Sequence, residues 1–219
     1  MSTLFNTLVM TAAISMLTAA TPGGEARAQK SDDFKFLTEQ FADAKMLRYQ
    51  VPGFEKLSLQ QKTLIYYLSQ AALCGRDITY DQNYKYNLLI RKSLEAIYTG
   101  YSGKKDTPEF VKFEEYLKRV WFSNGIHHHY STDKFFPEFP ESYLKTLVYG
   151  TKQETLPLAK GMTTDAFIAE LTELIFSPDV APKRVNLDAS QDLVTTSAAN
   201  FYEGVTQAEV KQYYEELRH

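Results

Sequence analysis

The chain of 219 residues is poor in the residue types that mark several specialised classes of protein. A single cysteine excludes an intramolecular disulfide framework. Ten glycines and eight prolines are too few for a collagenous or low-complexity chain. The formal net charge of −3 lacks the basic excess typical of nucleic-acid-binding proteins, so we expect no nucleic-acid partner. The remaining composition, 44% hydrophobic and 14% aromatic, argues against disorder and predicts a globular fold with a sizeable core.

The N-terminal stretch predicts export from the cytoplasm. Residues 8–20 carry no charge, and this run is shorter than the roughly 20 apolar residues that cross a bilayer as a helix. It matches the apolar region of a secretory signal, and Ala26 and Ala28 provide the small residues of a cleavage site. We therefore predict a signal peptide over residues 1–28, cleaved after Ala28, and a periplasmic or secreted protein with no membrane partner after cleavage. Because no Lys or Arg precedes Leu8, a frayed apolar terminus is the alternative.

Hydrophobic spacing over residues 29–219 predicts a mainly helical α+β fold with two or three short strands and no linker between domains. Helices are expected over about 59–75, 84–98, 108–123, 141–149, 164–175 and 206–217, with a short helical stripe over 34–41. Alternating residues predict strands over 45–51 and 193–196.

Three helix starts carry recognisable capping signals. Ser58 with Gln61, and Thr206 with Glu209, have the spacing of a capping box. Thr107 precedes a proline, which is a favoured residue in the first turn of a helix. The only cysteine, Cys74, follows the apolar residues 71–73, and we expect it to be a small buried core residue rather than a nucleophile.

Three consecutive histidines, His127 to His129, are the most unusual feature of the chain. Metal binding is one hypothesis, but adjacent side chains point in different directions, so three in a row rarely ligate one ion. The favoured interpretation is a loop whose imidazoles fill and hydrogen-bond a polar cleft wall. Nucleophile-elbow, phosphate-loop, dinucleotide-binding and C-x-x-C motifs are all missing, so we expect no catalytic residue and no metal ligand in this chain.

Several segments resemble dipeptidyl-peptidase III, a family of zinc metallopeptidases. Residues 124–137 (NGIHHHYSTDKFFP) are similar to a family segment that often reads G-N-Y-x-S-F-G-D-x-K-F and is followed by proline. Residues 59–75, with Tyr66 and Leu68, resemble the early Y-x-L-S-x-A-A helix of the family. Residues 193–209 resemble its T-T-Y-F-S-G-N-x-T segment. The matching segments occur in the same order along residues 34–219.

The resemblance implies part of one lobe of a two-lobed enzyme that releases dipeptides from the N-termini of short peptides. The family binds its zinc with H-E-x-x-G-H and a later E-E-x-x-x-[DE] motif, and the first of these does not occur in this chain. The resemblance thus implies an N-terminal portion that ends before the zinc site. We expect it to bind no zinc and to be inactive alone, with the missing C-terminal part of the peptidase as its partner.

The resemblance also implies which residues bind the substrate. Tyr130 falls on a cleft-lining phenylalanine of the family, and His128 and His129 replace its neighbours. Two alternatives stay open. Tyr130 is a plain packing aromatic in one of them. In the other, the chain is a self-sufficient periplasmic peptide- or metal-binding protein that uses the His127–His129 loop.

Overall fold

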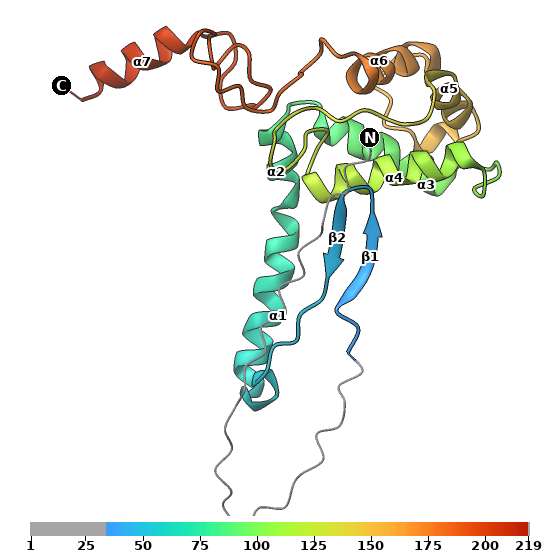
Figure 1. Ribbon diagram of the computed structural model, residues 1–219, viewed down its shortest axis with the longest axis vertical. Coiled ribbons are helices and arrows are strands. Elements are labelled where there is room, and N and C mark those ends of the chain that lie inside the picture. Colours follow the sequence, from blue (N-terminus) through green and yellow to red (C-terminus); the bar gives the residue numbers. More distant parts are fainter. Residues whose placement is uncertain (1–33, 219) are drawn as a thin grey trace, which may run out of the picture. The chain divides into compact units, whose positions relative to one another are not determined.

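The computed structural model describes residues 34–218, which form a mainly helical α+β fold, as predicted (Figure 1). The strands are β1 (Leu37–Phe41) and β2 (Ala44–Leu47), and the α-helices are α1 (Leu59–Cys74), α2 (Arg76–Asn83), α3 (Asn87–Gly100), α4 (Pro108–Ser123), α5 (Glu141–Tyr149), α6 (Thr164–Phe176) and α7 (Gln207–Glu216). Short 3-10 helices are η1 (Phe54–Lys56) and η2 (Gln153–Thr155). The predicted signal peptide and its cleavage after Ala28 lie outside the described residues. Within the described range, no helix has the length and apolar character needed to cross a membrane.

β1 and β2 form an antiparallel hairpin, although the apolar spacing over residues 34–41 predicts a helical stripe. Phe41 pairs with Ala44, and the tight turn between them places Ala42 at a φ of 45°. A helix this short is unstable unless tertiary packing supports it, whereas the next segment of the chain offers main-chain partners at once. The helical prediction for residues 34–41 is therefore wrong. The strand expected over residues 45–51 is present in part, since β2 ends at Leu47.

Helix α1 begins with the predicted capping box. The amide of Gln61 donates to Ser58 Oγ at 3.2 Å, and the amide of Ser58 donates to Gln61 Oε1 at 2.9 Å. The helix ends at Gly75, as predicted, but this glycine has a φ of −76° and the chain enters α2 directly. No residue of α1 is buried, and Cys74 is exposed. The prediction of a buried Cys74 is wrong because apolar sequence neighbours bury a residue only when another element covers them.

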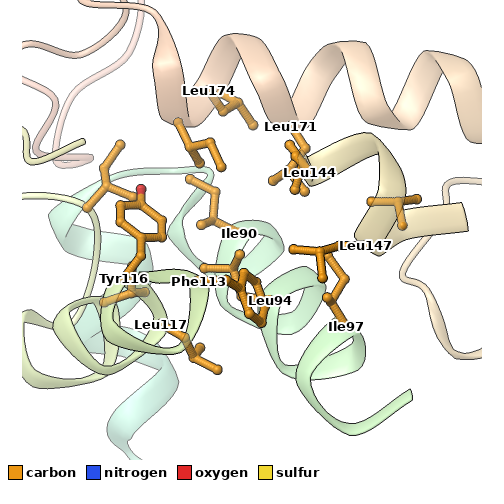
Figure 2. Close-up of a cluster of buried hydrophobic side chains, with 14 of the residues drawn as sticks. Ile90, Leu94, Ile97, Phe113, Tyr116, Leu117, Leu144, Leu147, Leu171 and Leu174 are labelled. Carbon is orange, nitrogen blue, oxygen red and sulfur yellow. The ribbon is translucent and has the colours of Figure 1, made fainter. Parts of the chain in front are cut away.

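The hydrophobic core lies among α3, α4, α5 and α6. Helices α3 and α4 pack against each other, as do α5 and α6, and α3 also contacts α6. Figure 2 shows side chains from all four helices converging on this core. The core residues with no exposed surface include Ile90, Leu94, Ile97, Phe113, Leu117, Leu144 and Leu147. The predicted helices over 84–98, 108–123, 141–149 and 164–175 are confirmed, with α3 beginning three residues later than expected.

The end of α4 sets the direction of the chain into the histidine run. Asn124 terminates the helix in the left-handed region, and Gly125 follows with a φ of 142°. The buried side chain of Asn87 lies against this glycine, donating to Tyr80 O at 3.2 Å and accepting from the amide of Ile126 at 3.2 Å. A Cβ atom on residue 125 would lie only 2.1 Å from Asn87 Nδ2. Only glycine therefore allows this close approach of the two segments.

Residues 193–196 form turns rather than the predicted strand. The carboxylate of Asp192 accepts hydrogen bonds from the amides of Val194 and Thr195, both at 2.9 Å. Such local side-chain bonds compete with strand pairing for the same amides, which is why the prediction is wrong. The other carboxylate oxygen accepts from the amide of Gln207 at 2.9 Å and joins this turn to the start of α7, whose predicted capping box is confirmed.

Candidate functional site

The histidine run lies in a closed loop after α4, here named the histidine loop (residues 126–134). His127 pairs with Lys134 in an isolated antiparallel bridge. The amide of His128 donates to Asp133 O at 2.8 Å, and the amide of Thr132 donates back to His128 O at 3.0 Å. Thr132 adopts a φ of 63°, which lets the loop reverse direction within a few residues. The main chain of the loop is thus well supported from within.

His127 is the buried member of the run, with 1% of its surface exposed. Its Nε2 lies 2.8 Å from the carbonyl oxygen of Ala181. Because a carbonyl only accepts, Nε2 carries the proton, and the buried Nδ1 has no hydrogen-bond partner among the described residues. Burial lowers the pKa of His127 to about 4, in spite of the bond to Ala181, which acts in the opposite direction. His127 is therefore neutral at pH 7 and joins the loop to the chain after α6.

Lys134 makes a second connection to the same segment. Its Nζ donates to the carbonyl oxygens of Ser177 at 2.6 Å and Val180 at 2.9 Å, and its amide donates to Pro182 O at 2.9 Å. Burial lowers the pKa of Lys134 to about 8. The ammonium group satisfies carbonyls beyond the C-terminus of α6 that would otherwise lack donors.

His128 uses both ring nitrogens within the protein. Its Nδ1 accepts hydrogen bonds from the amides of Tyr130 and Ser131, both at 3.2 Å. Its Nε2 lies 3.1 Å from Asp43 Oδ2, in the turn of the β1–β2 hairpin. The pKa of Asp43 lies below its ordinary value, mainly because its own backbone amide donates to it and to a smaller extent because of His128.

His129 and Tyr130 form the outer part of the loop. Their ring centroids are 4.4 Å apart, and the ring of His129 also meets Phe122 of α4 edge-to-face at 5.0 Å. Tyr130 is 84% exposed, so it is not a packing aromatic of the core. The predicted site residues His128, His129 and Tyr130 are thus adjacent, but only His129 and Tyr130 present their rings without a hydrogen bond to another part of the described chain.

The three imidazoles do not form a metal centre. His127 is bonded to Ala181, and His128 is bonded to Asp43 and two amides. The ring of His129 meets Phe122 edge-to-face and lies tilted against Tyr130. Across residues 34–218, no group of three or more His, Cys, Asp or Glu side chains is arranged to hold a metal ion. The described residues therefore do not fit the zinc that the family resemblance implies for the complete enzyme.

Two open hollows lie on the irregular chain between α6 and α7. The larger has a volume of about 770 Å³ and the smaller about 500 Å³, and Tyr84 and Thr195 line both. His127 lies behind the wall of the larger hollow, since its ring contacts Tyr84 edge-to-face and its Nε2 binds Ala181, another lining residue. Residues 128–130 line neither hollow.

Sequence reasoning missed Asp43, Lys134 and Ala181 as partners of the histidine loop. No sequence pattern predicted the contacts of Asp43 and Ala181 with the loop, because both residues lie far from it along the chain. Lys134 carried a weak signal, since it coincides with the lysine of the D-x-K-F pattern of the resembled family. The hollows were also missed, since their walls come from irregular chain without periodicity.

A comparison with models of known protein families gives no match, and a comparison with curated proteins gives no significant match either. The resemblance to dipeptidyl-peptidase III therefore stays a prediction from the residues quoted above.

Proposed function

We propose that this chain supplies the N-terminal lobe segment of an exported zinc exopeptidase that releases dipeptides from the N-termini of short peptides. The zinc of the complete enzyme would supply the activated water for peptide hydrolysis. The residues described here do not hold that metal, so their contribution is to bind and orient the peptide. The proposed partner is the C-terminal part of the peptidase, which would bring the H-E-x-x-G-H motif.

One observation carries the proposal. Tyr130, which coincides with the cleft-lining aromatic of the resembled family, is 84% exposed. Hydrogen bonds hold the main chain of its loop and the imidazoles of His127 and His128. An exposed tyrosine on a supported loop suits peptide contact, because its ring offers apolar area at little cost in side-chain entropy.

The uncovered helices α1 and α7 give additional support. Neither helix has a buried residue, although α1 carries several large apolar side chains and α7 carries Tyr213 and Tyr214. On α1, Leu64, Tyr67 and Leu68 are 58%, 65% and 59% exposed. Apolar helix surface of this kind is normally covered by another element, which agrees with a chain that functions within a larger assembly.

The DNA downstream of the His219 codon tests the proposal directly. We expect a reading frame that encodes H-E-x-x-G-H and then E-E-x-x-x-[DE], in frame or after a frameshift. A downstream sequence without either motif would contradict the proposal and leave the self-sufficient binding protein as the favoured alternative.

The purified chain provides the matching biochemical prediction. Incubated with tetra-alanine, it should release no dipeptide above the background of a buffer control, as measured by mass spectrometry, because it lacks the metal-binding motif. Release of dialanine that disappears on addition of a chelator would show that the chain carries its own metal site.

A further inference from the structure

The ring of His128 lies between two parts of the chain that are distant in sequence. On one side, its Nδ1 accepts from the amides of Tyr130 and Ser131. A ring nitrogen that accepts from two amides carries no proton, so the proton of the neutral ring lies on Nε2. On the other side, this Nε2 donates to Asp43, 85 residues earlier in the chain. Every hydrogen-bonding atom of the ring is engaged.

From this geometry we infer that His128 is a positioning residue, which holds the turn that presents Tyr130 outward, and not a residue that contacts the peptide itself. The inference rests on the proposed function only in treating Tyr130 as a peptide contact. It revises the expectation from sequence, in which His128 and Tyr130 bind substrate side by side.

The bonds at Nδ1 have the form of a side-chain turn. Nδ1 of histidine lies at the same number of bonds from the main chain as Oδ1 of asparagine, whose side chain often accepts from the amide two residues further on. His128 does the same with the amides two and three residues ahead, at Tyr130 and Ser131. The direction of the chain at Tyr130 thus depends on the side chain of residue 128.

The bond at Nε2 fixes the orientation of that ring. Asp43 lies in the turn between β1 and β2. The hairpin is also bonded to α4, because Lys118 Nζ donates to Glu39 Oε1 at 2.6 Å. The hairpin is therefore attached to the same helix that leads into the histidine loop. Phe41 of the hairpin also meets Phe122 of α4 edge-to-face at 6.1 Å, so the turn that carries Asp43 lies near the start of the histidine loop.

Asparagine at position 128 separates the bonds to the two amides from the bond to Asp43. Its Oδ1 can accept from the amides of Tyr130 and Ser131, but its side chain is too short to donate to Asp43 in the way that Nε2 does. The variant His128→Asn should therefore keep the turn, and His128→Ala should lose it. His129→Ala is a matched control, because it removes a neighbouring imidazole that makes no hydrogen bond to those amides.

Amide hydrogen exchange, followed residue by residue by NMR on the whole chain, tests the inference without any ligand. We expect exchange at Tyr130 and Ser131 to be about tenfold faster in His128→Ala than in wild type. Exchange should stay within about threefold of wild type in His128→Asn and His129→Ala. Unchanged exchange in His128→Ala, or exchange equally fast in His128→Asn, would overturn the inference.

Binding of tetra-alanine, measured by chemical-shift titration, connects the turn to the proposed function. Affinity should fall about fivefold or more in His128→Ala and Tyr130→Ala, and be largely restored in His128→Asn. A similar loss in His128→Asn, with the amides still protected, would mean that the imidazole itself contacts the peptide and would overturn the inference. If wild type binds no peptide while His128→Ala still speeds exchange, the proposed function fails and the positioning role stands.

Discussion

At the scale of single residues, buried polar side chains join the histidine loop to the chain after α6. His127 and Lys134 both contact the segment between Ser177 and Pro182, one through a neutral imidazole and the other through an ammonium group. Burial lowers the pKa of both groups, because the charged forms lose hydration that the protein replaces only in part. The attachment of the loop therefore depends on pH.

The stability of the protein should decrease as the pH falls from 6.5 to 4. The pKa of His127 is about 4 in the folded protein and 6.5 as its ordinary value, so the unfolded chain binds more protons across this window. His127 should account for a loss of about 3 kcal/mol in the free energy of unfolding. Urea titrations at a series of pH values measure this loss of unfolding free energy. In His127→Gln, whose amide can still donate to Ala181, this part of the pH dependence should disappear; an unchanged pH dependence would contradict the assignment.

Gly125 should be intolerant of even the smallest side chain. Alanine there would meet the Asn87 amide at 2.1 Å and would have to adopt a φ of 142°, so we expect a loss of about 3 kcal/mol in unfolding free energy. Gly161→Ala is the control, because Gly161 has a φ of 83° but no atom within 4 Å of its would-be Cβ. The unfolding free energy of Gly161→Ala should fall by only about 1 kcal/mol. Equal losses in thermal or urea unfolding would show that backbone strain, and not the contact with Asn87, determines the cost.

At the scale of elements, helices of similar length differ sharply in what they bury. Helix α3 buries Ile90, Leu94 and Ile97 completely, whereas no residue of α1 is buried. The apolar residues of α3 return at helical spacing on one face, and those of α1 are spread around the helix. A helix with its apolar residues on one face can be covered by one neighbouring element, but a helix with apolar residues spread around it needs contacts on several sides.

Leucine-to-alanine variants in these two helices should measure that difference. Leu94→Ala in α3 should cost about 2–5 kcal/mol of unfolding free energy, because it leaves a cavity in a closely packed core. Leu68→Ala in α1 should cost less than about 1 kcal/mol in the isolated chain, since the side chain is 59% exposed. Urea denaturation of both variants gives the comparison. A large effect of Leu68→Ala would mean that α1 is covered in solution.

At the scale of the whole molecule, stability should be concentrated in the unit formed by α3 to α6. The residues of α7 are not buried, while α4 contributes Phe113, Leu117 and Val120 to the core. Elements without buried contacts open locally at little cost in free energy.

Limited proteolysis should reveal this uneven distribution. Trypsin is expected to cleave after Lys211 in α7 well before it cleaves after Lys118 in α4, with the shortened product retaining its helical circular dichroism. Lys118 is a suitable comparison, because it is partly exposed and belongs to a helix that contributes to the core, although it is paired with Glu39 and Glu114. Cleavage at both lysines at the same rate, read by mass spectrometry, would contradict the expectation.

Much of this fold follows from local sequence patterns. The capping boxes at Ser58 and Thr206, the Thr107-Pro108 helix start and the apolar spacing of α3 to α6 are short-range features, and each led to a correct helix. Such signals work because capping bonds and helical faces involve residues only three or four positions apart. The histidine run was also visible in the sequence, because its three residues are consecutive.

Contacts between distant residues decided the rest. Residues 37–41 form a strand because β2 lies beside them, and Cys74 is exposed because nothing covers α1 within the described residues. The roles of the three histidines differ because Ala181, Asp43 and Phe122 approach them from separate parts of the chain. Adjacent, identical side chains have the same local chemistry, and only the partners supplied by folding make one a buried connection, another a support for a turn and the third an aromatic contact of Phe122.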